Sequence, residues 1–363
     1  MPDLELRIPG SASSSKISIG PFEAGKAFSG SAPAAIIADS LVLRVFGSLL
    51  PPGPRIEVPR GESAKSLETL EAVWDSFLEL GLDRSSMVLA VGGGATSDLA
   101  GLASSTWMRG LPFEYAPTTL LAMVDASVGG KTGIDFRGRK NLVGTFSQPR
   151  RVHCDVAFLD SLDELQFASG MAEAIKHAVL AGGAYAAFVE GLGGVRPRAS
   201  TASGRAALEA LVLGSIEIKA GIVSRDERES GERRLLNLGH SIGHALEAIL
   251  GIPHGHAVAA GLASEARLGI ILGHGDRPTL DRLLGLLSAW KLPDSISAAF
   301  ALSGKPDDGQ GRDLAGEALA ADKKRDGGEL RIPFPAGASA GFGACIERRI
   351  TLGELMTQLK SLP

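Results

Sequence analysis

Short apolar segments alternate with helical segments in the first half of the chain, and this alternation constrains the fold more than any other feature. The expected strands cover residues 35–38, 56–58, 86–91 and 113–116, and the expected helices cover 41–50, 66–80 and 98–108. Apolar residues recur every three or four positions from Leu67 to Leu80, as they do on the buried face of a helix. Strands that alternate with helices predict a parallel, doubly wound α/β sheet.

After about residue 160 the sequence predicts helices and no further strands. Helical patterns rich in alanine and leucine cover residues 171–180, 206–229, 235–250, 258–272 and 280–289, and loops are expected over 191–204 and 303–313. We therefore expect two domains, an α/β domain over residues 1–159 and an all-α domain over residues 160–363. A cleft between two such domains would be the natural place for a binding site.

Composition argues against several classes of protein. The net charge of −4 includes no run of basic residues, so we expect neither nucleic acid nor an anionic membrane as a partner. Cys154 and Cys345 are the only cysteines, which predicts no disulfide framework and a reducing cytoplasm. Asp3 and Glu5 lie where a signal peptide would be basic. No apolar run reaches the ~18–20 residues of a membrane span, so we expect a soluble, cytoplasmic protein.

Four of the seven histidines lie within seventeen residues, at His240, His244, His254 and His256. His240 and His244 are four residues apart and would share one face of a helix. Imidazoles at this spacing predict a site for a divalent ion such as zinc. The pattern resembles the H-E-x-x-H helix of metalloproteases, but Ser241 replaces the glutamate that would act as general base, which argues against a protease.

A glycine-rich turn, Gly92-Gly93-Gly94-Ala95-Thr96-Ser97-Asp98, follows an expected strand and precedes an expected helix. Such a turn presents backbone N–H groups and a helix N-terminus to an anion, as in dinucleotide binding. Ser97 replaces the third glycine of G-x-G-x-x-G, so a plain strand-to-helix turn is an equal alternative. No acidic residue stands where the usual ribose ligand is expected, so an NAD site here would have another design.

A second Gly-Lys segment covers residues 124–133 and ends in Gly129-Gly130-Lys131-Thr132-Gly133. It lacks the G-x-x-x-x-G-K-[ST] spacing of a P-loop, which argues against an ATPase. Lys131, Lys140 and Asn141 could instead bind a phosphorylated small molecule, the alternative being a solvated surface.

Charged residues also interrupt the apolar helical patterns of the second half. Glu173 and Lys176 are one helical turn apart in Gly170-Met171-Ala172-Glu173-Ala174-Ile175-Lys176. An ordinary surface ion pair is one explanation. The small apolar residues around them predict a packed helix instead, where a carboxylate needs a partner such as a metal ion.

Taken together, these segments resemble the 3-dehydroquinate synthase family, whose members are NAD-dependent sugar-phosphate cyclases of the shikimate pathway. The resemblance covers nearly the whole chain, and its segments are 92–148, 170–176, 217–219, 233–244, 254–261 and 322–324. It implies a Rossmann-like N-terminal domain that binds NAD and a helical C-terminal domain that binds metal and substrate.

The resemblance also implies roles for individual residues. The implied ligands of a zinc or cobalt ion are Glu173, His240 and His254, with His256 outside the coordination set. The implied NAD contacts are Asp39, Glu62, Lys65, Gly93, Gly94, Ala95, Asp98, Thr118, Thr119, Lys131, Lys140, Ser161 and Leu162. The implied substrate and catalytic residues are Arg109, Asp125, Lys131, Asn141, Lys176, Lys219, Arg233, Asn237, His244, Lys323 and Lys324.

The implied reaction converts 3-deoxy-D-arabino-heptulosonate 7-phosphate to 3-dehydroquinate and phosphate. NAD would take a hydride and return it, so that it emerges unchanged. In this family the residue at the position of Arg109 reaches across a dimer interface, which implies a homodimer. The sequence departs from the family pattern at Ala95-Thr96-Ser97, at Asp163 and at Gln166, and these departures bear on NAD affinity.

Three alternatives remain. The first is a sibling cyclase of secondary metabolism, which would share the metal ligands and differ in its substrate contacts. The second is a metal-dependent polyol dehydrogenase, which would release NADH; the basic residues expected around the substrate argue against it. The third is a non-catalytic metal-binding or scaffold protein, although every position that the chemistry needs is filled.

Overall fold

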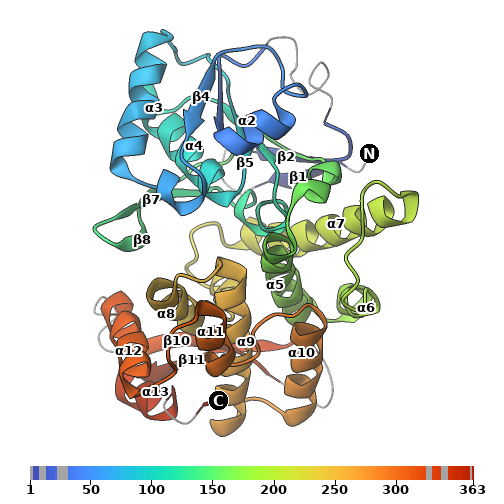
Figure 1. Ribbon diagram of the computed structural model, residues 1–363, viewed down its shortest axis with the longest axis vertical. Helices are drawn as coiled ribbons and strands as arrows, with labels where there is room; N and C mark the ends of the chain where they lie inside the picture. Colours follow the sequence, from blue (N-terminus) through green and yellow to red (C-terminus); the bar gives the residue numbers. More distant parts are fainter. Residues whose placement is uncertain (1–2, 8–13, 23–31, 324–328, 337–341, 360–361) are drawn as a thin grey trace. The chain divides into compact units, whose positions relative to one another are not determined.

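The computed structural model describes residues 3–7, 14–22, 32–323, 329–336, 342–359 and 362–363. The chain forms two compact units (Figure 1). Unit 1 contains residues 1–162 and 197–228, and unit 2 contains residues 163–196 and 229–363. The sequence predicts a single boundary after residue 159, whereas the chain crosses between the units after residues 162, 196 and 228.

Unit 1 is built on a seven-stranded sheet with the order β1-β2-β9-β6-β5-β3-β4. Its strands are β1 (Asp3–Arg7), β2 (Ser14–Ile19), β3 (Ala35–Asp39), β4 (Arg55–Val58), β5 (Val88–Gly92), β6 (Phe113–Pro117) and β9 (Arg151–Cys154). β1 pairs antiparallel with β2, and every other neighbouring pair is parallel. All residues of β3, β5 and β6 are buried, as expected for parallel strands covered on both faces. The predicted α/β sheet is confirmed.

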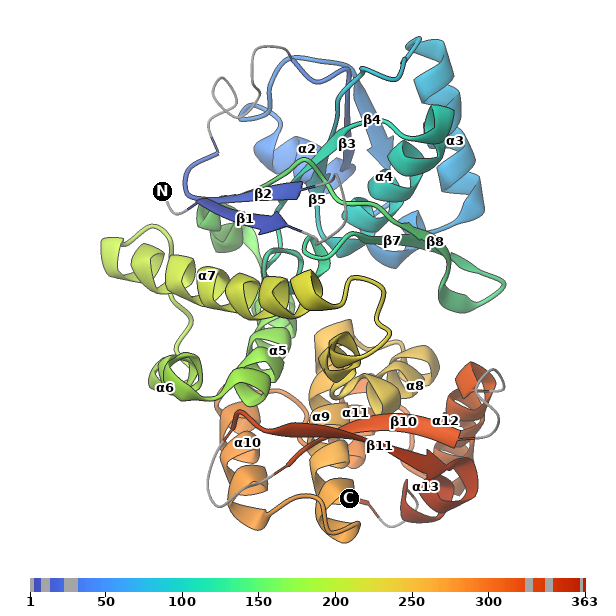
Figure 2. The same cartoon turned by 180° about the vertical axis from the view of Figure 1, so that it is seen from behind.

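The helices of unit 1 connect these strands. They are α2 (Ser40–Phe46), η1 (Gly61–Ala64), α3 (Leu67–Glu79), α4 (Gly94–Thr106), η2 (Trp107–Arg109), η3 (Ala122–Ala126), η4 (Val156–Ser161) and α7 (Ala202–Arg225). α4 packs on β5, β6 and β3, while α7 packs on β1, β2, η3 and η4 (Figure 2). β7 (Lys131–Phe136) and β8 (Arg139–Phe146) form a separate antiparallel hairpin, which the sequence does not predict.

Unit 2 is mainly helical. Its helices are α5 (Glu164–Ala181), α6 (Gly183–Gly191), η5 (Glu232–Asn237), α8 (His240–Leu250), α9 (His254–Ile271), α10 (Arg277–Ala289), α11 (Ile296–Ser303), α12 (Gly309–Lys323) and α13 (Leu352–Leu359). α9 is buried at almost every position from Gly255 to Gly269 and contacts α5, α8, α10 and α11. A helix that is buried on nearly every side belongs in a core, and α5, α8, α10 and α11 pack against α9.

Three details of unit 2 differ from the expected helical pattern. The strands β10 (Glu329–Pro335) and β11 (Cys345–Thr351) pair antiparallel, so the unit is not wholly α-helical. The predicted helix over 235–250 is interrupted at Gly239, whose φ of 81° is left-handed, and α8 therefore begins at His240. The loop expected over 303–313 ends early, because α12 begins at Gly309.

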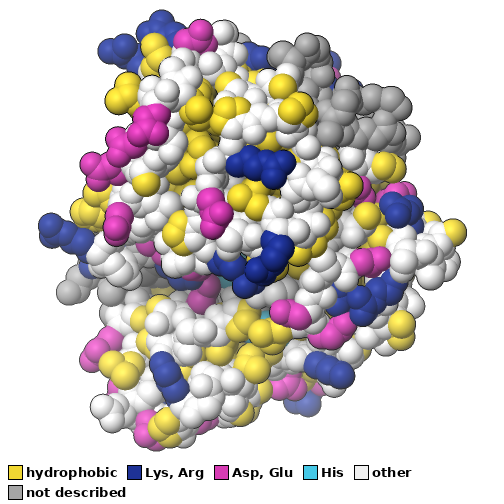
Figure 3. Space-filling model, turned by 45° about the horizontal axis from the view of Figure 1, so that its top comes forward, with side chains coloured by type: hydrophobic (Ala, Val, Ile, Leu, Met, Phe, Trp, Pro, Cys, Tyr) yellow, Lys and Arg dark blue, Asp and Glu magenta, His cyan; other side chains and the backbone are white. Residues whose placement is uncertain are grey.

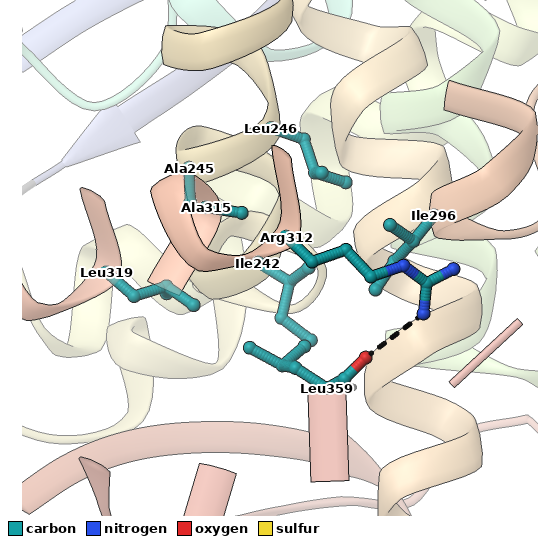
Figure 4. A pocket seen from close by; sticks show the side chains of 8 residues that line it. All are labelled: Ile242, Ala245, Leu246, Ile296, Arg312, Ala315, Leu319 and Leu359. Carbon is teal, nitrogen blue, oxygen red and sulfur yellow. Dashed lines mark hydrogen bonds between the residues drawn. The ribbon is translucent and has the colours of Figure 1, made fainter. Parts of the chain in front are cut away.

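A small pocket in unit 2 is lined by side chains of α8, α11, α12 and α13 (Figure 4). Arg312 lies at this pocket and donates hydrogen bonds to the carbonyls of Leu359 (3.5 Å) and Leu362 (2.7 Å). The other lining residues are Ile242, Ala245, Leu246, Ile296, Ala315, Leu319 and Leu359. This lining offers no carboxylate, imidazole or thiol, so the pocket is not the candidate site.

Two observations concern the apolarity of the described helices and the distribution of charge on one face of the molecule. Among the residues that the structure describes, no helix has both the length and the apolarity needed to cross a membrane. On the face drawn in Figure 3, Lys and Arg side chains are interspersed with acidic and apolar ones.

Candidate functional site

Three potential metal ligands come together in unit 2. Glu173 lies in the middle of α5 with no exposed surface, while His240 and His254 are the first residues of α8 and α9. Glu173 Oε1 is 3.5 Å from His240 Nε2 and 3.4 Å from His254 Nε2. Oxygen and nitrogen ligands ~2.1 Å from a tetrahedral zinc ion are about 3.4 Å apart. Glu173 therefore lies at the spacing from each of the two histidines that such an ion requires.

His244 belongs to the same cluster. Its ring centroid lies 5.0 Å from that of His240 and 5.7 Å from that of His254. Potential ligand atoms of the three histidines all lie within 4.8 Å of one another. The closer spacing of Glu173 to His240 and His254 favours these three as ligands and leaves His244 beside the site.

The two predicted histidine ligands differ in their electrostatic surroundings. Burial, reinforced by the nearby Lys176 ammonium, lowers the pKa of His240 well below its ordinary value. Burial would also lower the pKa of His254, but its hydrogen bonds with Glu173 and Glu247 outweigh burial and raise the pKa to about 10. His240 is therefore neutral and has a lone pair to give, whereas a metal ion must displace a proton from His254.

This raised pKa predicts how the metal-free protein responds to pH. A raised folded-state pKa contributes stability that is complete below the unfolded value of 6.5 and is lost as the pH rises towards about 10. We expect the urea midpoint of metal-free protein to fall over this pH range by more in the wild type than in a His254→Ala variant. Equal pH dependence in both proteins would contradict this assignment. Metal uptake at neutral pH should also release protons.

Carboxylates surround this cluster. Glu173 forms an ion pair with the buried Lys176 one helical turn away. Glu247, which is also buried, accepts from His254 Nδ1 at 3.1 Å, and this contact directs Nε2 of the same ring towards Glu173. A carboxylate on the far nitrogen of a ligating histidine is the common arrangement around protein-bound metals. The sequence analysis does not identify Glu247, although its position three residues after His244 on one helix face could have indicated it.

Several residues predicted to contact NAD lie at one edge of the sheet in unit 1. Asp39 ends β3, Gly93 follows β5 as the N-cap of α4, and Thr118 follows β6. β3, β5 and β6 are neighbouring parallel strands, so their carboxyl ends meet at this edge, where open α/β sheets bind ligands.

The glycine turn at this edge is closely packed. A Cβ on Gly93 would lie 3.3 Å from Thr119 Cγ2, and one on Gly94 would lie 3.1 Å from Ala126 Cβ. Bare backbone at the start of the 13-residue helix α4 suits an approaching phosphate. Ser97, the departure from the glycine pattern, is buried and donates to the carbonyl of Gly93 at 3.3 Å. It therefore packs within the turn.

Lys65 joins several of the predicted contacts. Its buried ammonium donates to Asp98 Oδ2 at 2.6 Å and to the side-chain oxygen of Asn141, and it lies 3.9 Å from Glu62. Lys140 Nζ lies 3.6 Å from Glu62. Burial lowers the pKa of Lys65, but the neighbouring carboxylates outweigh burial and give a net rise, so Lys65 stays cationic. Asn141 has a left-handed φ of 52° on β8.

Two predicted substrate contacts pair with each other in unit 1. Lys219 Nζ on α7 lies 2.9 Å from Asp125 Oδ1 and donates to the backbone carbonyl of Asp125 at 2.7 Å. The Lys219 side chain is largely buried. A carboxylate of a substrate would therefore compete with Asp125 for this cation.

The remaining predicted residues are more dispersed. Arg109 is exposed and has a left-handed φ of 68°, Lys131 is exposed at the start of β7, and Ser161 and Leu162 lie at the end of η4. In unit 2, Arg233 is buried in η5, and Asn237 donates to Glu229. Ala95 lies in the first turn of α4. Lys323 ends α12, and Lys324 lies outside the described residues.

The departures at the start of α5 also have a structural role. Asp163, where the family pattern often has proline, is the N-cap of α5 and accepts from the backbone N–H of Gln166 at 2.7 Å. A capping carboxylate of this kind stabilises a helix by about 1 kcal/mol. Gln166 itself is exposed in the first turn.

Sequence comparisons cover most of the chain. The family model of the 3-dehydroquinate synthase N-terminal domain matches residues 55–169, and that of the C-terminal domain matches residues 170–324. The 3-dehydroquinate synthase of Pelobacter propionicus is 39% identical over 327 residues, which are 88% of this chain and 86% of that protein. The enzyme of the same name from Geotalea uraniireducens is 44% identical over 249 residues, 67% of each chain.

Solved structures define the class of fold. A 2-epi-5-epi-valiolone synthase from Streptomyces hygroscopicus, solved with NAD+ and Zn2+, superposes with a TM-score of 0.82 and 27% identity over 98% of both chains. A 2-deoxy-scyllo-inosose synthase complexed with carbaglucose-6-phosphate, NAD+ and Co2+ has a TM-score of 0.80 over 99% of both chains, and at 22% identity it supports the fold alone. The fold is thus the one that these synthases share. Within this class, the chain belongs to the 3-dehydroquinate synthase family.

Proposed function

We propose that this protein is a 3-dehydroquinate synthase, a lyase that converts 3-deoxy-D-arabino-heptulosonate 7-phosphate to 3-dehydroquinate and phosphate with NAD and a divalent metal as cofactors. The product belongs to the shikimate pathway, which leads to chorismate and the aromatic amino acids. The observation that carries the proposal is the spacing of Glu173, His240 and His254 in a chain of this family.

Glu173, His240 and His254 would hold the metal ion. Two imidazoles and a carboxylate leave a coordination position open, as catalytic zinc sites do. A bound zinc or cobalt ion would lower the pKa of a substrate hydroxyl and polarise a carbonyl. His244 lies beside these ligands and would exchange a proton with the substrate.

The strand edge of unit 1 would hold NAD, whose chemistry is reversible hydride transfer. The amides at the start of α4 suit its pyrophosphate, and on either side of β5 Asp39 ends β3 and Thr118 follows β6. Glu62, Lys65, Asp98 and Lys140 would add polar contacts from the network around Lys65. The other contacts proposed for NAD are Gly93, Gly94, Ala95, Thr119, Lys131, Ser161 and Leu162.

Cationic and amide side chains would bind the substrate's anionic groups. Lys219 and Arg233 are buried and would bind its carboxylate, while Lys131, Asn141, Arg109, Lys323 and Lys324 would bind its phosphate. Asp125, Lys176 and Asn237 would contact its hydroxyl groups. Each of these assignments derives from matching family motifs.

We also propose a cytoplasmic homodimer. Arg109 is exposed and has a left-handed backbone conformation, and the family resemblance places a residue at this position across a dimer interface, which supports a contact with a second copy. Cys154 and Cys345 are both free thiols, as expected in a reducing compartment.

A sibling cyclase is the second candidate, because the valiolone synthase has the same fold over nearly its whole length. The two functions differ in whether the substrate carries a carboxylate. Purified protein should release phosphate from the heptulosonate phosphate much faster than from sedoheptulose 7-phosphate, which lacks the carboxylate. The reverse preference would establish the sibling activity and contradict the proposal.

Glu247 provides a prediction about the metal site. Replacing it with glutamine removes the charge that holds the His254 ring through Nδ1. We expect Glu247→Gln to weaken zinc binding about 10- to 100-fold, the usual effect of losing such a partner. Competition with a chromogenic chelator measures this affinity. An affinity equal to that of the wild type would show that the contact does not tune the site.

A further inference from the structure

The N-terminus of α8 is capped by a side chain from another helix. Its N-cap residue, Gly239, has no side chain to accept hydrogen bonds from the first amides of the helix. Glu265, a fully buried residue of α9, takes this role. Glu265 Oε2 accepts from Gly239 N at 2.5 Å, and Oε1 accepts from the backbone N–H groups of Ser241 (3.1 Å) and Ile242 (3.4 Å).

The same region brings the two backbones into direct contact. A Cβ on Gly261 of α9 would lie 1.9 Å from the carbonyl oxygen of Gly239, and a Cβ on Gly243 of α8 would lie 2.9 Å from that of Ala257. α8 therefore has little freedom to shift along α9 at this end.

His240 lies within the segment that Glu265 holds. It is the first residue of α8, between two of the residues that donate to the Glu265 carboxylate. His240 Nδ1 is 3.2 Å from the carbonyl oxygen of Leu238, immediately before the capped turn, and His240 Nε2 lies 3.5 Å from Glu173 Oε1. The orientation of this imidazole thus depends on a backbone segment whose position Glu265 determines.

We propose that Glu265 is a positioning residue for the metal site, acting through the backbone of residues 239–242 to direct His240 Nε2 towards Glu173. This proposal rests on the proposed function, which makes His240 a metal ligand. Each of the two helices thus positions the metal ligand of the other. Glu247 of α8 contacts His254 of α9, and Glu265 of α9 caps the segment that carries His240 of α8. The two ligands would then be aligned before any metal arrives.

Glu265→Gln tests this role. Backbone N–H groups donate to both oxygens of the Glu265 carboxylate. Whichever way the glutamine side chain is oriented, its NH2 group therefore faces one of these N–H donors and cannot accept from it. We expect cobalt(II) affinity, measured by chelator competition, to fall about 10- to 100-fold. The visible absorption bands of bound cobalt(II), which report coordination geometry, should also change.

Ser264→Ala is the matched control. Ser264 is a buried neighbour of Glu265 on α9, and its hydroxyl donates to the carbonyl of Ala260 at 2.7 Å. This variant should lower the melting temperature and leave cobalt affinity and spectrum unchanged. If Glu265→Gln does not fold, Glu265→Asp, which keeps the charge but shortens the side chain, should show the same changes to a smaller degree.

The outcomes separate this proposal from the one on which it rests. If wild type binds one cobalt ion per chain and the folded Glu265 variant binds it with the same affinity and spectrum, Glu265 has only a structural role and this inference is wrong. If the wild type binds no cobalt, both the metal site and its positioning residue are wrong. Weaker binding with an altered spectrum, absent in Ser264→Ala, supports the proposal.

Discussion

Replacing His254 with alanine should remove bound metal and abolish turnover. The variant would leave Glu173 and His240 as the only two proposed ligands, too few for a catalytic zinc site. Because the whole ion is lost, we expect turnover to fall by more than the ~10²- to 10³-fold that loss of one electrostatic contact costs. Metal content by elemental analysis and phosphate release are the two measurements.

His256→Ala is the control for this experiment. His256 lies two residues away on the same helix and is buried, but it is not part of the His240, His244 and His254 cluster. Its replacement should leave metal content intact and reduce activity only mildly. Full metal content and full activity in His254→Ala, or loss of metal in His256→Ala alone, would contradict the assignment of ligands.

Arg233→Lys should lower kcat/KM for the heptulosonate phosphate sharply and leave metal content unchanged. Arg233 is a buried arginine in η5, and a planar guanidinium can bind a carboxylate through two parallel hydrogen bonds that lysine cannot reproduce. A buried charge pair that loses its partner costs about 2–5 kcal/mol. This corresponds to about a 30- to 5,000-fold loss in kcat/KM.

The neighbouring arginine provides a matched control. Arg234 is partly exposed, and its guanidinium lies 3.8 Å from Glu347, the geometry of a weak surface ion pair. Arg234→Lys should therefore keep nearly full activity. A silent Arg233→Lys, or equal losses in both variants, would contradict the role of Arg233 in binding the substrate carboxylate.

The central strands of the sheet could be predicted because β3, β5 and β6 are buried on both faces and appear as continuous apolar runs. β10 carries Pro333 and Pro335, and proline argues against a strand unless the strand lies at an edge. In β11 charged residues interrupt the apolar pattern, as expected for a half-exposed strand. Two-stranded sheets of this kind leave a weak signal in the sequence.

The sequence also does not predict that α7 belongs to unit 1, although the segment before it belongs to unit 2. Lys219 on this helix lies beside Asp125, 94 residues earlier in the chain, and no local pattern reports such a contact. Helical periodicity predicts that a helix exists and which face is apolar, but not the unit against which that face packs.

The sequence predicts the ligands of the candidate metal site, but not the residues that hold those ligands in place. Histidine spacing indicates a cluster at His240 and His254, and the resemblance adds Glu173. The sequence does not single out Glu247 or Glu265, because a glutamate within a helical pattern is usually a solvated residue. Their burial and their contacts with His254 and the start of α8 depend on how α8 and α9 pack.

The most direct test of the central claim compares phosphate released with NAD supplied. Metal-loaded protein is mixed with excess heptulosonate phosphate and far less NAD+ than substrate, and phosphate and NADH absorbance are followed together. A cyclase that returns its hydride should release many phosphates per NAD+ with no accumulation of NADH. NADH that accumulates in step with substrate consumption, or phosphate release that stops after one turnover per NAD+, would contradict the account.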